Sequence, residues 1–281
     1  MREKNIHWFP GHMKKALNEI ERRVKLIDVV IEILDARAPQ SSMNYFLEEK
    51  IKTKPHLFLL SKADLSDPIE NEKWIAHFQK DGNKALIGNL NDKNIIVQIK
   101  KALGELAVQK REREKRRGMK PQAIKTMIIG IPNVGKSTLI NKIAKRASAG
   151  VENRPGLTRS EQWIKVDKDF ILLDTPGILP MNYENQEIAA KLALIGSIRE
   201  DILPYDVLVS HLLDILNTFY PNSLSERFDV TNLKDEQSVI EKIALKRGLI
   251  SSGKIDLAKA ERLLIQEFKD GLLGKITLER I

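Results

Sequence analysis

The 281-residue sequence contains no cysteine, which excludes disulfide bonds, thiolate metal sites and a cysteine nucleophile. It also lacks any apolar run of the ~20 residues that a membrane-spanning helix needs. The residues after Met1 are charged and lead into no apolar segment, so we expect no secretory signal and a cytoplasmic location. The expectation that remains is a globular protein, and the 42% of hydrophobic residues can supply its core.

Negative charge is in short supply relative to positive charge, which gives a net charge of +9. A basic protein often contacts a polyanion, and we weigh nucleic acid above simple solubility as the reason. Residues 110–120, KREREKRRGMK, are nearly all charged. Two interpretations of this stretch stay open: a solvated helix end with a linker, or a contact to RNA or DNA phosphates.

The sequence GIPNVGKST, residues 130–138, is the strongest motif of the chain. A short apolar strand precedes it at 126–130 and a helical pattern follows at 136–144, which is the context of a phosphate-binding P-loop. An ordinary Gly/Pro turn is the alternative, and agreement at all eight motif positions and both flanks disfavours it. The stretch therefore predicts a nucleotide site.

The P-loop residues have distinct expected roles. Backbone N–H groups and the N-terminus of the following helix would surround the β-phosphate. Lys136 would contact the β- and γ-phosphates and contribute to catalysis, and the Ser137 hydroxyl would ligate Mg²⁺. The nucleotide contacts predicted here are Pro132, Asn133, Val134, Gly135, Lys136, Ser137 and Thr138.

Two downstream stretches fit the same site. Asp174 begins the sequence DTPG after an expected strand, and its carboxylate would hold Mg²⁺ through a water molecule. The N–H of Gly177, which ends that sequence, would contact the γ-phosphate. Thr158 lies in the preceding loop, where it would complete the Mg²⁺ shell. DTPG alone could be a strand-end turn, and its place after the P-loop favours the functional interpretation.

The sequence SKAD, residues 61–64, fits the guanine-reading motif NKxD. Asp64 would accept hydrogen bonds from guanine and Lys62 would pack its stem over the base. Ser61 stands where asparagine is expected, so we expect a weaker or altered affinity for guanine. The next strand leads to Gly88 and Asn89, where the side chains match the usual base loop poorly and main-chain donation would serve instead.

The order of these motifs predicts a circular permutation, because the base-reading loops precede the P-loop. Strand and helix patterns alternate in the first part of the chain, which predicts an α/β fold with a mostly parallel sheet. The later residues are helical without alternating strands, so we predict a permuted P-loop GTPase domain over 1–183 and a separate all-α domain over 184–281. Strands are expected at 28–34, 56–60, 85–87, 126–130, 161–166 and 170–173, and helices at 13–26, 43–51, 69–79, 91–110, 136–144, 187–199, 205–219, 236–246 and 256–270.

Several motifs together resemble the bacterial ribosome biogenesis GTPase A family over nearly the whole chain. They are WFPGHM (8–13), DARAP (35–39), the P-loop, PGLT (155–158), DTPGI (174–178) and KRG (246–248). The resemblance implies a GTPase that binds an immature large (50S) ribosomal subunit and its rRNA, helps its late maturation and is activated by that particle. It also implies that the helical domain, 184–281, binds RNA. We expect no DNA or membrane partner and a monomer away from the ribosome.

The resemblance also implies roles for His12 and Asn133. Ile178 follows DTPG where Ras-like enzymes place a water-orienting glutamine, so another group must act on the water. The family histidine of WFPGHM matches His12, which would be catalytic; the alternative is a helix cap or packing against Trp8 or Phe9. Asn133 matches the asparagine that coordinates K⁺ in potassium-activated relatives, or it makes loop hydrogen bonds alone.

Two other functions remain possible at this stage. A GTP-binding RNA scaffold with negligible hydrolysis is favoured by Ser61 and Ile178. A GTPase acting on a membrane or signalling partner is disfavoured by the basic helical region and the lack of a lipidation motif. The expected ligands are GTP, Mg²⁺ and K⁺.

Overall fold

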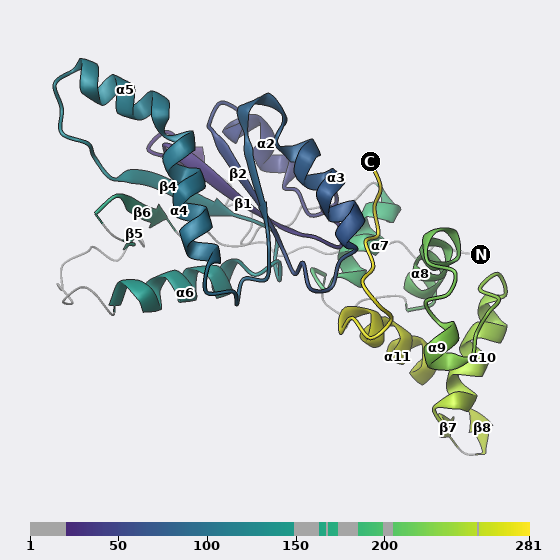
Figure 1. Cartoon of the computed structure of the whole chain (residues 1–281). Helices are drawn as coiled ribbons and strands as arrows, with labels where there is room; N and C mark the ends of the chain where they lie inside the picture. Colours follow the sequence, from purple (N-terminus) through teal and green to yellow (C-terminus); the bar gives the residue numbers. More distant parts are fainter. Residues whose placement is uncertain (1–20, 149–162, 167, 174–184, 199–204, 252) are drawn as a thin grey trace.

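The computed structural model of the protein describes residues 21–148, 163–166, 168–173, 185–198, 205–251 and 253–281. These residues form an α/β unit followed by a group of helices (Figure 1). None of the helices in these ranges combines the length and apolar character needed to cross a bilayer.

A six-stranded sheet in the order β3-β2-β1-β4-β6-β5 lies at the centre of the α/β unit. Five strands are mutually parallel, and β5 alone runs antiparallel to its neighbour β6. Pairing of β1 with β4 joins the part of the sheet that comes first in the chain to the part that leads into the P-loop. This arrangement confirms the predicted permuted α/β fold. The strands are β1 Val29–Asp35, β2 His56–Ser61, β3 Lys84–Ile87, β4 Ile124–Ile129, β5 Trp163–Lys165 and β6 Phe170–Leu173.

Helices cover both faces of the sheet because its central strands are apolar on both sides. On β2, Phe58 and Leu60 belong to the cluster packed by α3 (Pro68–Phe78), where the rings of Phe58 and Phe78 are 4.6 Å apart. Leu57 and Leu59 alternate with them and pack on the other face, with the apolar side of α4 (Ile95–Leu106). The remaining helices of this unit are α2 (Tyr45–Ile51), the short η1 (Lys80–Gly82), α5 (Val108–Arg116) and α6 (Lys136–Ser148).

The single helix expected over 91–110 is wrong, because the structure has two helices there. The α4 helix gives way to α5 at Ala107, whose backbone leaves the helical range. Lys110 then donates to the Asp28 carboxylate at 2.5 Å and to the Ala123 carbonyl at 2.9 Å. These contacts hold α5 against the start of β1 and β4, a long-range effect that local periodicity does not contain. The basic stretch, for which a helix end with a linker was one of two interpretations, is helical up to Arg116.

The second group comprises α7 (Gln186–Leu194), α8 (Tyr205–Phe219), α9 (Ser225–Phe228), α10 (Glu236–Lys246) and α11 (Leu257–Lys269). A short hairpin of β7 (Ile250–Ser251) and β8 (Lys254–Ile255) lies among them, and neither it nor α9 was expected. The α7 helix stops well before the expected residue 199, because Gly196 adopts a left-handed backbone with φ +79°. The apolar core of the sheet continues without interruption into these helices.

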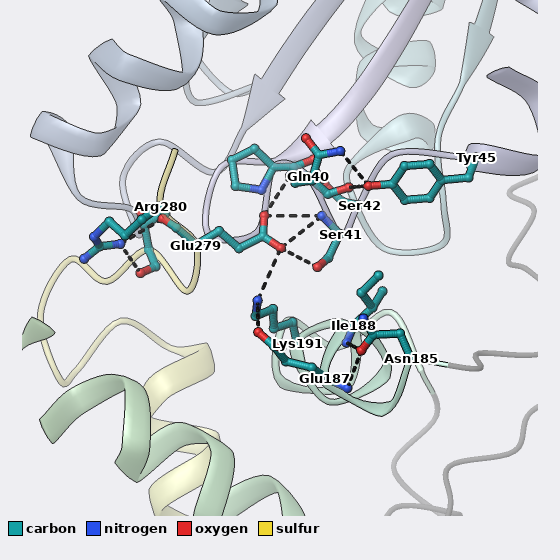
Figure 2. Close-up of polar contacts among 12 residues, drawn as sticks. Gln40, Ser41, Ser42, Tyr45, Asn185, Glu187, Ile188, Lys191, Glu279 and Arg280 are labelled. Carbon is teal, nitrogen blue, oxygen red and sulfur yellow. Dashed lines mark hydrogen bonds and ion pairs between the residues drawn. The ribbon is translucent and has the colours of Figure 1, made fainter. Parts of the chain in front are cut away.

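The segment after α11 returns to the α/β unit. The Glu279 carboxylate accepts hydrogen bonds from the backbone N–H groups of Gln40 at 2.7 Å and Ser41 at 3.0 Å, in the loop that follows β1. Figure 2 shows Glu279 between this loop and Lys191 of α7, whose ammonium is 4.0 Å away. Burial raises the pKa of the Glu279 carboxyl, and the N–H donors and Lys191 oppose that rise. These contacts link α7 to the loop after β1.

Candidate nucleotide-binding site

The P-loop follows β4 at the carboxyl edge of the sheet. At Gly130 an added Cβ would lie 2.9 Å from the Ile33 carbonyl oxygen, so the close approach of β1 requires glycine there. The loop borders a hollow of about 460 Å³, within the range of small-ligand sites. Its lining residues are Ile131, Pro132, Asn133, Gly135, Lys136, Ser137 and Thr138. The structure thus gathers nearly all of the predicted P-loop contacts around one hollow.

The first turn of α6 supplies three of these residues, Lys136, Ser137 and Thr138. Ser137 and Thr138 are exposed, so the Ser137 hydroxyl is accessible to a Mg²⁺ ion held by phosphates. Unpaired N–H groups and the dipole of a helix N-terminus favour phosphate at this place. Val134 differs from the others because its side chain is buried in the core, which leaves only its backbone to serve a ligand.

The base-reading loop after β3 packs directly on the P-loop. Gly135 has φ +100°, and an added Cβ would lie 2.5 Å from Cδ1 of Leu90. Lys142 on α6 donates to the Leu90 carbonyl at 2.8 Å and also to the carbonyl of Asp92. Sequence reasoning missed Lys142, since nothing in the motif indicates that a lysine one turn and a half along the helix holds this loop.

Ser61 connects the other base-reading loop to the P-loop. Its hydroxyl lies 2.6 Å from the Val134 carbonyl oxygen and 3.0 Å from that of Leu34, both acceptors. The side chain is fully buried at the end of β2. The serine that replaces the expected asparagine thus keeps a link between the SKAD loop and the P-loop through a shorter group.

Replacing Ser61 by alanine should weaken GTP binding about fivefold. The loss of one buried hydrogen bond costs about 1 kcal/mol, and here it loosens the contact between two ligand loops. Titration with a fluorescent GTP analogue measures the change. Ser66→Ala is the matched control, because Ser66 is also buried but donates to Asn71 at 2.9 Å and not to the P-loop. An equal loss of affinity in both variants would contradict a specific role for Ser61.

The Lys62 side chain is held by the buried carboxylate of Asp35, which lies at the end of β1. The Lys62 backbone is left-handed, with φ +57°, and its ammonium is 2.8 Å from Oδ2 of Asp35. The Arg37 guanidinium pairs with the same carboxylate, also at 2.8 Å. Burial alone would raise the pKa of Asp35, but these two cations outweigh it and lower the pKa to about 2. The carboxylate thereby fixes where the Lys62 stem runs.

Arg37 also reaches the helices that follow the sheet. Its guanidinium donates to the carbonyl oxygens of Ile195, after α7, at 3.2 Å and of Lys269, in α11, at 3.3 Å. The side chain is only 2% exposed, so each of these contacts is shielded from water. One arginine therefore joins the end of β1 to two helices that lie more than 150 residues away in the sequence. The sequence motif DARAP marked this position without indicating those partners.

The remaining base-reading residues lie in the same loops. Asp64 is exposed and makes no ion pair with any other residue in the described ranges, which leaves its carboxylate open to a base. The Gly88 N–H donates to the Leu60 carbonyl at 3.0 Å and so continues the pairing of β2 with β3. The Asn89 side chain accepts from the Asn91 N–H at 2.8 Å and shapes its own loop. Its contribution to a ligand would therefore be through the main chain.

The segment after α7 contacts the P-loop, a contact that sequence reasoning missed. Asn133, with φ +64°, donates from Nδ2 to the Gly196 carbonyl at 2.6 Å. The Ser197 hydroxyl donates to the Pro132 carbonyl at 2.9 Å. The hydrogen bond to Gly196 is made by the nitrogen of the Asn133 side-chain amide. It does not use the amide oxygen, which is the atom that a K⁺ ion would bind. The K⁺ role of Asn133 therefore stays a prediction.

Four predicted site residues lie outside the described ranges. They are His12, Thr158, Asp174 and Gly177. Their expected roles in catalysis, Mg²⁺ binding and γ-phosphate contact remain predictions. A second hollow, of about 810 Å³, lies near the amino ends of β2 and β3, beside His56 and Lys84. It is at the wrong end of the parallel strands for the P-loop and takes no part in this site.

Comparison with known proteins gives consistent matches. Residues 125–245 match the family model described as 50S ribosome-binding GTPase. The chain is 42% identical over 277 residues to ribosome biogenesis GTPase A of Bacillus pumilus, with 98% of each chain covered. It is 34% identical over 296 residues to mitochondrial ribosome-associated GTPase 1 of Ictalurus punctatus, covering 97% of this chain and 92% of that one. Among solved structures, GNP-bound YlqF from T. maritima is similar with a TM-score of 0.67 and 25% identity, over 95% of this chain and 98% of that one.

Proposed function

The chain belongs to the ribosome biogenesis GTPase A family, and we propose that it hydrolyses GTP in the late maturation of the large (50S) ribosomal subunit. Membership in this family implies that the protein is a GTPase that takes part in ribosome assembly. The finer parts, namely the large subunit, rRNA binding and activation by the particle, are the proposal. The proposal also includes a cytoplasmic location and a monomeric state when the protein is not bound to the ribosome.

The hydrogen bond between Ser61 and the Val134 carbonyl is the observation that carries the proposal at the site. It joins a loop with a guanine-type carboxylate, Asp64, to a P-loop beside a hollow of ligand size. A guanine base and its phosphates would therefore be held by one rigid assembly. Selectivity for guanine would come from the Asp64 carboxylate, because adenine offers no pair of donors there.

Two cations fit the residues around the P-loop. Mg²⁺ prefers oxygen ligands and keeps phosphate and water in its shell, which suits the exposed Ser137 hydroxyl together with Thr158 and Asp174. We propose that K⁺ binds the Asn133 carbonyl oxygen and the phosphates. Bound there, it would supply the positive charge that an arginine finger supplies elsewhere.

His12 is the proposed catalytic group, together with Lys136. The residue after DTPG is Ile178, which cannot orient water by hydrogen bonding. An imidazole has a pKa near neutrality and can orient water or accept its proton. Activation would then consist of holding residues 8–13 beside the γ-phosphate when the protein is on the ribosome. We also propose a domain boundary between residues 183 and 184, with residues 184–281 forming the RNA-binding domain.

Turnover of GTP tests this function, measured in K⁺ or Na⁺ and with or without purified immature large subunits. We expect stimulation by the particles, stronger in K⁺. Replacing His12 by alanine should lower the stimulated rate by about 10²–10³, because general-base catalysis contributes on that order. GTP affinity should not change. His7→Ala, in the same segment, is the control.

Three results would count against the proposal. Equal stimulated rates in wild type and His12→Ala would exclude the catalytic role of His12. Identical rates in K⁺ and Na⁺ would exclude the K⁺ site. Tight GTP binding with negligible turnover in the presence of large subunits would favour a scaffold that uses GTP as a structural ligand.

A further inference from the structure

The α5 helix and the turn after it concentrate the positive charge of the chain. Residues 108–120 contain seven lysines and arginines and two glutamates, a net charge of +5 in a chain whose total is +9. The helix projects at the end of the molecule opposite α8–α11 (Figure 1). It is also remote from the P-loop, since it is anchored near the start of β1 and β4. Nucleotide binding therefore leaves this charge unexplained.

Some of the cations on α5 have structural roles. Lys110 pairs with Asp28, and Arg111 pairs with Glu114 at 2.9 Å while donating to the Gln122 carbonyl. Glu114 is buried, so this part of the helix faces the protein. These contacts hold α5 firmly in place. They neutralise the inner face and leave the outer face to solvent.

The outer cations have no such partners. Arg113, Lys115, Arg117 and Lys120 are exposed, and none of them pairs with a carboxylate in the part of the chain that the structure describes. Arg116 has only an exposed contact to Glu112 at 3.6 Å, of a kind that contributes little. Arg113 and Arg116 also border a hollow of about 580 Å³ beside α5, together with Lys54. Exposed cations, most of them without a carboxylate partner among the described residues, are thus grouped on this side of α5.

We propose that the outer face of α5, Arg113–Lys120, binds the phosphate backbone of RNA, as a second contact besides the helical region. This inference rests on the proposed function, in which the partner is a ribosomal particle. RNA suits the surface because cations without carboxylate partners can displace the counterions of a polyphosphate. Residues 108–120 contain no aromatic side chain, so the surface offers no stacking for bases. The contact is therefore to phosphates and independent of sequence.

The test compares wild type with the triple variant Arg113→Ala, Lys115→Ala and Arg117→Ala. The probes are immature large subunits and a duplex RNA hairpin, over a series of KCl concentrations. We expect affinity for both probes to fall roughly tenfold or more at low salt, and the slope of log K against log salt to become shallower by about two to three, since each phosphate contact contributes ~0.7–0.9. GTP affinity and basal turnover should stay the same.

Two controls separate charge from structure. Arg113→Lys, Lys115→Arg and Arg117→Lys keep the charge and should bind as wild type does. Lys80→Ala, Lys101→Ala and Lys165→Ala remove three exposed charges elsewhere on the α/β unit and should have little effect. Unchanged binding of the α5 variant to both probes would overturn the inference and leave the proposed function standing. Failure of wild type itself to bind large subunits would refute the proposed function instead.

Discussion

Replacing Arg37 by alanine is expected to lower the free energy of unfolding by about 3–5 kcal/mol, because it leaves a buried carboxylate with one cation in place of two. Asp35 is fully buried and accepts from the Arg37 side chain through both carboxylate oxygens, at 3.0 and 2.8 Å. Lys62 alone would remain as its charged partner. Urea denaturation at neutral pH measures the loss.

The same substitution should loosen the helices from the sheet. Arg37 bonds the carbonyls of Ile195 and Lys269 and lies 5.6 Å from the centre of the Phe268 ring. Hydrogen exchange should therefore become faster at the end of α7 and in α11. Because the folded pKa of Asp35, about 2, is below its unfolded value of ~4, its contribution is complete above pH 4 and declines as pH falls toward 2.

Two variants serve as controls for Arg37. Asp35→Asn with Arg37→Met removes both charges and should recover much of the stability lost in the single variant. Arg116→Ala removes an exposed arginine whose ion pair with the exposed Glu112 is 3.6 Å long, so its cost should be under ~1 kcal/mol. A double variant no more stable than Arg37→Ala would contradict the account of a buried carboxylate that has lost one of its two cations.

Replacing Gly135 by alanine should weaken GTP binding about a hundredfold. The left-handed φ of +100° disfavours any other residue by ~1–2 kcal/mol, and the new methyl group would meet Leu90 Cδ1 at 2.5 Å. Together these effects amount to about 3 kcal/mol, or two powers of ten in affinity. Titration with a fluorescent GTP analogue measures the loss.

The structure offers a way to divide that effect. Gly82→Ala introduces the same kind of strain, at φ +77°, with no atom within 4 Å of the new Cβ, and it should not affect GTP binding. Adding Leu90→Ala to Gly135→Ala removes the collision and keeps the strain, so about half of the lost binding free energy should return. No recovery in the double variant would show that the contact with Leu90 is unimportant.

Local patterns predicted the elements that bear the site. The expected strand at 56–60 and helices at 205–219 and 236–246 match the structure within a residue, because their apolar periodicity agrees with their packing. The ends of helices that are set by tertiary contacts were harder to predict from the sequence. The break at Ala107 depends on Lys110 meeting Asp28, and no window of sequence holds both. The end of α7 at Gly196 could have been inferred, since glycine favours the left-handed conformation found there.

The sequence predicted the motifs of the candidate site but did not predict the hydrogen bonds that join them. The P-loop motif named residues that line the hollow, and the SKAD motif named a loop that is bonded to the P-loop through Ser61, because phosphate and base chemistry constrain a few adjacent positions. The contacts of Ser61 to Val134, Lys142 to Leu90 and Asn133 to Gly196 join residues 52 to 73 positions apart. Such pairs leave no signal in a single sequence. The roles of His12 and Asp174 stay predictions.

The position of β1 in the middle of the sheet has a consequence for synthesis on the ribosome. Its neighbour β2 emerges soon after it, but its other partner, β4, pairs Thr126 with Val29 and emerges almost a hundred residues later. During that interval a strand that is fully buried in the finished fold has one open edge, which is prone to pair with another chain. The P-loop part of the sheet would then dock late onto a preformed half, and folding would be slow because this contact is so distant in sequence. A protein that serves ribosome assembly would thus itself depend on protection of the nascent chain.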